Sequence, residues 1–315
     1  MVCFSSLSIG AKSMEWTTVF AIITNFDETN TNHQVIVQSR LPRLIGALVI
    51  GASLAVSGAL MQGMTRNYLA SPSIMGVSDG SVFMITILMI FLPTTSPLMM
   101  ISSSLVGSAI GAGVVFGIAS VIPGGYSPVR LAVLGTIIGT FLAGVSQALA
   151  TYFQISQNIS FWYNARLHQM DPTLLKWVLP FGLVGMLFAL FLAKQVSLLS
   201  LGEEISVGLG LRIRLIKGLV FLAVVILTGI SVALAGKIAF VGLAVPHIAR
   251  FIVGQDYRKI IPSSALIGGL LLAFCDVVSR LINFPFETPV GVVTAIFGVP
   301  FLLYLIKTRG GKQRV

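Results

Sequence analysis

Charged side chains are scarce in this chain: Asp, Glu, Lys and Arg make up 10% of its 315 residues, whereas in soluble domains they make up about a quarter. Hydrophobic residues account for 56% of the chain, and the mean hydropathy is +0.96. This composition excludes an ordinary soluble domain and indicates a polytopic membrane protein.

Residues that build disulfides, metal centres and nucleotide sites are also few. The two cysteines, Cys3 and Cys275, lie far apart without a CxxC pair, so we expect unpaired thiols. The three histidines form no ligand cluster, and His247, which follows a proline, is expected to be packed and hydrogen-bonded. No G-x-x-x-x-G-K-[ST] phosphate loop occurs. We therefore predict no metal, no cofactor and no catalytic residues, and another chain must handle any ATP.

The net charge of +10 raises the question of nucleic-acid binding. However, the basic residues are dispersed over many short loops, which argues for a role in membrane topology and against a nucleic-acid partner. If residues 44–64 run inward, 13 of the 20 Lys and Arg residues fall on the cytoplasmic face and the other seven on the outer face. The C-terminus is then cytoplasmic, and the pair Arg40 and Arg43 is external.

Eight apolar runs are long enough to be membrane helices. They are residues 44–64, 74–92, 98–121, 131–152, 178–199, 216–235, 265–282 and 290–306. A ninth run, 240–253, contains Pro246, His247 and Arg250, so it is expected to be a half-length or broken span packed inside protein. We predict one all-α transmembrane domain over residues 1–315, with nine to ten helices. Residues 1–43 form an external segment, and a first span is either upstream or absent.

A cytoplasmic loop at residues 200–214 has the pattern of a short helix. Gly202 precedes the acidic pair Glu203 and Glu204, which favour a helix start through the macrodipole. Gly208 and Gly210 then permit a sharp reversal, so two short helices across the cytoplasmic face are expected. From composition alone, this loop is either a solvated connector or a lever for a soluble partner.

Five stretches, in order along the chain, resemble the permease subunits of iron-siderophore, haem and cobalamin ATP-binding-cassette (ABC) importers. The match of the first and fourth stretches together is highly specific. The stretches are Arg40-Leu41-Pro42-Arg43 with residues 52–62, residues 65–67 with 69–70 and 74–78, residues 201–204, residues 233–236 with 238–250, and residues 289–294 with 298–301. One departure is Asp79, which stands where a small or amide residue is usual.

The resemblance implies a type II ABC importer permease fold and a passive channel through the membrane of a prokaryotic cell. It implies three kinds of protein partner: a second permease subunit, identical or different; two cytoplasmic ATPase subunits; and an extracytoplasmic binding protein. The expected cargo is an iron chelate, foremost a ferric siderophore, with haem or cobalamin as the alternative.

The resemblance also assigns roles to residues. Arg40, Arg43 and Arg280 match positions that receive acidic residues of the binding protein. From the residues alone, Arg40 and Arg43 could instead anchor the chain at the interface, and Arg280 could pair with Asp276, one helical turn earlier.

The cytoplasmic loop becomes the segment that couples the permease to its ATPase. The residues concerned are Leu201, Gly202, Glu203, Glu204, Gly208 and Gly210. The turn from Asn67 to Leu69 is either a cytoplasmic gate or a simple turn between spans.

Two other function classes are weighed against this one. An ion-coupled secondary transporter should carry inverted repeats with broken helices at matching positions, but only residues 240–253 look broken. A membrane-embedded enzyme needs a nucleophile and base or a metal cluster facing the interior, whereas the sole deep carboxylate, Asp276, has Arg280 beside it.

Overall fold

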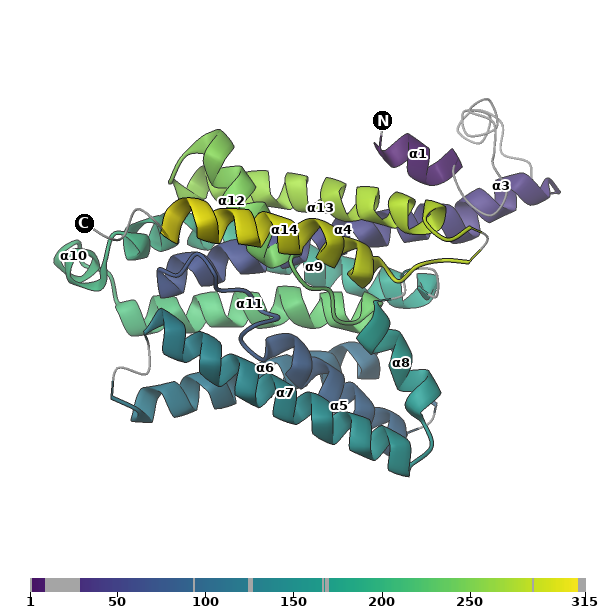
Figure 1. Ribbon diagram of the computed structural model, residues 1–315, viewed down its shortest axis with the longest axis horizontal. Helices are drawn as coiled ribbons and strands as arrows, with labels where there is room; N and C mark the ends of the chain where they lie inside the picture. Colours follow the sequence, from purple (N-terminus) through teal and green to yellow (C-terminus); the bar gives the residue numbers. More distant parts are fainter. Residues whose placement is uncertain are drawn as a thin grey trace.

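The computed structural model describes residues 2–8, 29–92, 94–123, 127–165, 167, 170–284 and 286–310. Met1, residues 9–28 and residues 311–315 lie outside this description, and with them about half of the predicted external segment and the extreme C-terminus. The described part of the chain is helical throughout and contains no strand. Figure 1 shows long helices running roughly side by side along one axis.

The helices are α1 (Val2–Ser8), α3 (Thr31–Val35), a π-helical turn η1 (Ile36–Arg40), α4 (Leu41–Thr65), α5 (Val77–Phe91), α6 (Pro97–Val121), α7 (Pro128–Tyr152), α8 (Ser156–Asn164), α9 (Pro172–Ser200), α10 (Glu203–Gly208), α11 (Ile213–Ala235), α12 (Val241–Val253), α13 (Tyr257–Leu281) and α14 (Val290–Gly310). Six helical segments of the described chain are long and apolar enough to cross a membrane, and α5, α12 and α14 add shorter apolar helices. The predicted all-α polytopic fold is confirmed.

The first span begins well before the apolar run that predicted it. Helix α4 continues backward through η1 and α3, so residues Thr31–Thr65 form one helical segment. Hydropathy does not include the polar residues before position 44 in the span. These residues can still extend the helix, because a helix satisfies its backbone hydrogen bonds internally. The π-helical turn precedes Pro42, which has no N–H to bond four residues back.

Two helices are too short to span. Helix α5 has 15 residues and α12 has 13, which correspond to roughly 22 Å and 20 Å at 1.5 Å per residue, against a hydrocarbon core of about 30 Å. The predicted full span at residues 74–92 is therefore wrong in length. The half-length span predicted near residues 240–253 is confirmed, and Pro246 lies inside it.

Close helix contact in the core depends on glycine. At Gly51 of α4, an added Cβ would overlap the backbone of Gly268 on α13, and the reverse holds at Gly268. Helix α4 is the central element, since 78% of the most apolar part of the helical segment Thr31–Thr65 is buried. Small residues allow backbones to approach where lipid supplies no hydrophobic driving force.

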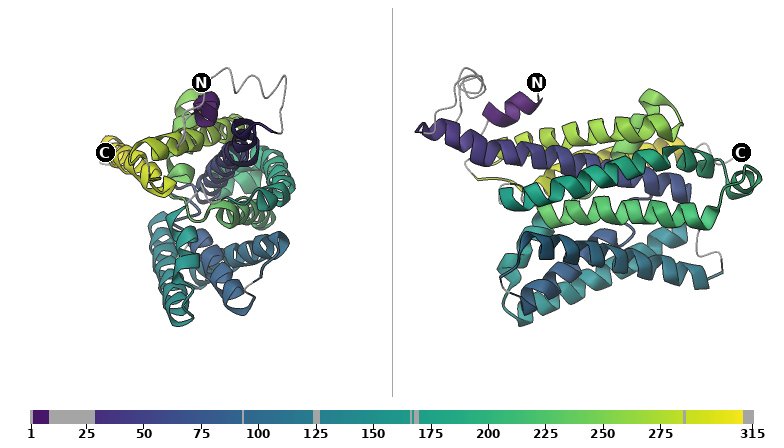
Figure 2. Two further views of the ribbon diagram at one scale, coloured as in Figure 1. Left: turned by 90° about the vertical axis from the view of Figure 1, so that its right-hand side faces the viewer. Right: turned by 180° about the vertical axis from the view of Figure 1, so that it is seen from behind.

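Different helices cover the two sides of the bundle. Figures 1 and 2 both place α7 and α14 on one side, while α4, α9 and α11 face the opposite side. One end of the bundle carries α10 and is called the α10 end here. The opposite end carries α1 and the start of α4, which contains Arg43, and is called the Arg43 end.

Candidate functional site

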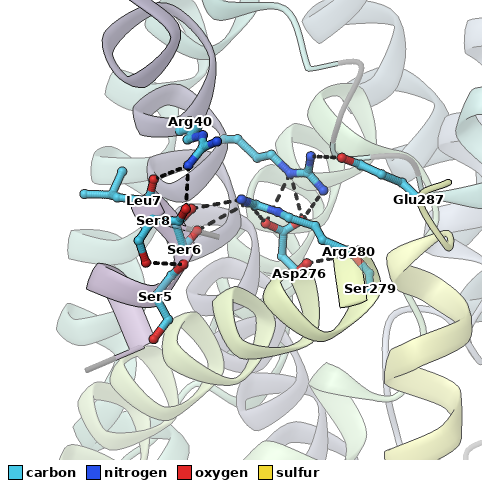
Figure 3. A network of polar contacts seen from close by, with 10 residues as sticks. Ser5, Ser6, Leu7, Ser8, Arg40, Asp276, Ser279, Arg280 and Glu287 are labelled. Atoms are coloured by element: carbon cyan, nitrogen blue, oxygen red, sulfur yellow. Dashed lines mark hydrogen bonds and ion pairs between the residues drawn. The ribbon is translucent and has the colours of Figure 1, made fainter. Parts of the chain in front are cut away.

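A network of ion pairs lies at the Arg43 end (Figure 3). Arg43 Nε and Nη2 lie 2.9 and 2.7 Å from Asp276 Oδ1, and Arg43 Nη1 donates to Glu287 Oε1 at 2.9 Å. Arg280 Nη2 pairs with the other oxygen of Asp276. The Asp276 side chain is completely buried, and two guanidinium groups balance its charge.

Further donors of Arg40 and Arg280 bind the last turn of α1. Arg40 Nη1 donates to the carbonyl oxygens of Leu7 (2.6 Å) and Ser8 (2.9 Å), and Arg280 Nη1 donates to that of Ser6 (2.9 Å). The final carbonyls of a helix have no partner within it, so a cation there satisfies them and complements the helix dipole. Two arginines from distant segments thus fix α1 against η1 and α13.

All three arginines predicted to dock a binding protein lie at this one end, as expected. They are nevertheless directed inward: Arg40 is 7% exposed and Arg280 5%, and the Arg43 side chain is 11% exposed. The local pairing of Arg280 with Asp276 is present. Docking by these residues stays a prediction, because the isolated chain contains no binding protein.

At the α10 end, the predicted coupling loop forms one short helix, α10, where two were expected. Gly202 (φ +127°) precedes it and Gly210 (φ +80°) follows it, both in backbone conformations that favour glycine. Gly208 is the last residue of the helix, and Glu203 and Glu204 form its first turn. The acidic first turn agrees with the dipole argument, whereas the residues after Gly210 lead directly into α11.

Helix α10 is held firmly to its neighbours while exposing apolar side chains. The Ser206 hydroxyl donates to Leu198 O on α9 (2.9 Å), and Lys217 Nζ of α11 lies 2.7 Å from Glu203 Oε1. The hydrogen bond from Lys217 is the main reason that the pKa of Glu203 lies below its usual value. Four apolar side chains around this helix are more than half exposed, and we call them the apolar knob: Leu201, Ile205, Val207 and Leu209.

The predicted gate residues form a tight turn. Asn67 Oδ1 accepts the backbone N–H of Leu69 at 2.9 Å; Asn67 is buried and Leu69 is exposed. His247 Nε2 lies 2.9 Å from the carbonyl oxygen of Tyr68, so His247 is packed and hydrogen-bonded as expected. The Arg250 guanidinium stacks over the Tyr68 ring at 4.6 Å. Helix α12 therefore holds this turn from one side.

Sequence reasoning did not find several polar partners. Glu287 and the α1 carbonyls lie far along the chain from the arginines that bind them. Asp79 is also buried and forms an ion pair with Lys237 at 2.6 Å across 158 positions, so the expectation that Asp276 is the sole deep carboxylate is wrong. The one available signal was Asp79 itself, an acidic residue near an apolar run, which membrane segments rarely tolerate without a partner.

Comparison with known proteins agrees with this arrangement. Residues 1–308 match the model of the FecCD transport family. The chain belongs to that family. It is 57% identical over 308 residues to the iron-uptake system permease protein FeuB of Bacillus subtilis, covering 98% of this chain and 92% of that protein. It is 47% identical to the iron(3+)-hydroxamate import system permease protein FhuB of the same organism, covering 96% and 79%.

A solved structure described as an inward-facing conformation of a putative metal-chelate type ABC transporter is 28% identical. Its TM-score is 0.82, and the match covers 98% of this chain and 95% of that one. The FecCD-family chain is thus a multi-pass membrane permease of an ABC transporter, a non-catalytic transport subunit. Permeases of this kind act as dimeric membrane units with ATPase and binding-protein partners.

Proposed function

We propose that this chain is the permease subunit of an ATP-driven importer that carries a ferric siderophore into the cytoplasm of a prokaryotic cell. The observation that carries the proposal is the full-length similarity to two iron permeases, one named for hydroxamate import. Two such subunits, identical or different, would enclose the passage. Two ATPases would bind at the α10 end, and a binding protein at the Arg43 end.

The apolar knob supports the assignment of the α10 end to the ATPase. Four exposed apolar side chains on a short, tethered helix are costly in water and suit insertion into a cleft of a soluble partner. Because Ser206 and the Glu203–Lys217 pair join α10 to α9 and α11, movement of the cleft would be passed directly to two spans. This is conformational gating by a bound partner.

The Arg43 end supports a docking role of a specific kind. Its arginines already have internal partners, so an acidic residue of a binding protein would have to compete for them. Glu287 is the partner that is most easily displaced, because its side chain is 30% exposed while Asp276 is buried. We therefore propose that docking exchanges Glu287 for a carboxylate of the binding protein at Arg43, with Arg40 and Arg280 holding the surface in shape.

The turn from Asn67 to Leu69 is proposed to narrow the cytoplasmic exit. It lies beside His247 and Arg250 of α12, so a shift of α12 would move the turn with it.

The test is uptake of labelled cargo by cells that lack this chain and are complemented with it. The cargo panel contains ferric catecholate and hydroxamate siderophores, haem and cobalamin. We expect wild type to restore uptake of one ferric siderophore. Ile205→Asp should fail to restore it, and the control Ile205→Val, which keeps the apolar knob, should succeed. Restoration of haem or cobalamin uptake alone would contradict the siderophore assignment.

A further inference from the structure

The ion pair between Asp79 and Lys237 lies within the membrane-spanning bundle. Asp79 is in the first turn of α5, and Lys237 is in the linker between α11 and α12. Their side chains meet at 2.6 Å and differ in exposure: the carboxylate is 4% exposed and the ammonium group's side chain 30%. Ionisable groups at this depth usually face the bundle interior or a water-filled cavity.

Both residues belong to places where the backbone is irregular inside the bundle. After α4, the chain returns to the middle of the bundle before α5 begins, and residues 236–240 run inward from the end of α11 to the start of α12 (Figure 1). Non-helical backbone at membrane depth is tolerated only where it is buried in protein or lines an aqueous cavity. Here it does both.

A cavity of about 270 Å³ opens beside the ion pair. Its polar lining comes from three separate segments and comprises Ser73, Asp79, Thr136, Thr140 and Lys237. Gly139 of α7 completes the wall, and an added Cβ there would lie 2.7 Å from Asp79 Oδ2. The absent side chain leaves room for the carboxylate to lie against α7.

The exposed surface of α7 carries two stripes of different character. Thr136, Thr140 and Gln147 form an exposed polar stripe, of which Thr136 and Thr140 line the cavity, while Ile137 and Phe141 belong to an exposed apolar stripe beside it. Polar residues in spans generally face a cavity or a partner, and these two threonines line the cavity directly. The polar stripe therefore marks the side of α7 that meets water.

We propose that this cavity is a contact site for the ferric chelate on the wall of the transport passage. Lys237 is the exposed member of the pair, so a passing chelate meets its N–H donors, while Asp79 fixes the ammonium group from behind. The ligand class is a chelate with negatively charged oxygen atoms on its outer surface. A volume of about 270 Å³ lies just below the usual range of roughly 300–1,000 Å³ for ligand pockets, so it receives one edge of the chelate.

The site rests on the proposed function for its ligand but can be tested without transport. In a full-length transporter carrying Cys3→Ser and Cys275→Ala, a single cysteine is placed at Thr140 or, as the matched control, at Phe141. Each is treated in membranes with an anionic (sulfonatoethyl) or a cationic (trimethylammonium-ethyl) methanethiosulfonate. We expect Thr140→Cys to react about tenfold faster than Phe141→Cys, because charged reagents concentrate in an aqueous cleft.

The role of Lys237 is read from the charge of the reagent. With each rate divided by the rate of the same reagent with a small free thiol in solution, Thr140→Cys should react several-fold faster with the anionic reagent, and the double variant Asp79→Asn/Lys237→Gln should remove this preference. The double variant is used because it leaves no unpaired buried charge. Ferric enterobactin, a highly anionic catecholate chelate, should slow the anionic reaction when Lys237 is present and have no effect in the double variant.

Three results would overturn the proposal: equal reactivity at Thr140→Cys and Phe141→Cys, a charge preference that survives in the double variant, or no protection by ferric enterobactin. The first two reject an aqueous site governed by Lys237. The third rejects the chelate contact. If all three labelling results are as expected but the cells take up no siderophore, the proposed transport function is wrong and the site is not.

Discussion

Asp276 is the carboxylate on which the Arg43 end depends, and Asp276→Asn is the most informative single change there. The carboxylate is fully buried and pairs with both Arg43 and Arg280. Removing one partner of a buried pair typically costs about 3–5 kcal/mol, because the remaining charge is left uncompensated. Arg43 retains Glu287, and Arg280 retains its hydrogen bonds to Ser6 on α1. We therefore expect a loss near the lower bound, about 3 kcal/mol.

The assay is reversible unfolding of the purified chain in mixed micelles by titration with SDS. The double variant Asp276→Asn/Arg280→Met should recover about 1–2 kcal/mol relative to Asp276→Asn alone, since it removes the buried positive charge that Asp276 no longer neutralises. Recovery should be incomplete because the contact between Arg280 and α1 is also lost. A loss below about 1 kcal/mol for Asp276→Asn, or strictly additive effects in the double variant, would refute the reasoning.

Three further predictions concern packing, pH and a helix cap. Gly51→Leu should lower the unfolding free energy by about 1–3 kcal/mol or more, because its side chain would meet the backbone of Gly268; SDS titration measures this. Lys217 lowers the pKa of Glu203, so this pair stabilises the fold fully above the usual carboxyl value of 4.5 and loses its effect as pH falls through the lowered pKa. The stability difference between wild type and Glu203→Gln should therefore shrink in acid. Asp256→Ala should cost about 1 kcal/mol in SDS titration, because Asp256 caps α13.

Each of these has a control. Gly51→Ala should cost less than Gly51→Leu, and equal costs would contradict close contact between the α4 and α13 backbones. A difference between wild type and Glu203→Gln that grows as pH falls would contradict the sign worked out for the Glu203–Lys217 pair. Asp256→Asn keeps a capping oxygen, so it should be closer to wild type than Asp256→Ala.

Those parts of the fold that depend on local chemistry were predictable from the sequence. Apolar runs located the spans because a helix in lipid needs about 20 apolar residues. The pairing of Asp276 with Arg280 followed from their spacing of four on one helix. Gly202 and the acidic residues after it predicted the position of α10. They also led us to expect a second short helix, which the structure does not contain between residues 201 and 212.

What the sequence could not predict depends on contacts between distant segments. Arg43 and Asp276 are 233 positions apart, and Asp79 and Lys237 are 158 apart. No periodicity links such pairs, because their approach is decided by how whole helices pack. The start of the first span at Thr31 was missed for a different reason: hydropathy reports solubility in lipid and does not report helix formation outside it.

ATP-dependent accumulation of a radio-iron siderophore in vesicles tests the proposed function most directly. The vesicles contain this chain with its permease partner and ATPase, and the loaded binding protein is supplied on the side that α1 faces. We predict accumulation that requires ATP and is abolished by Ile205→Asp in the apolar knob. Accumulation that persists without ATP or ATPase and follows an imposed ion gradient would contradict the assignment.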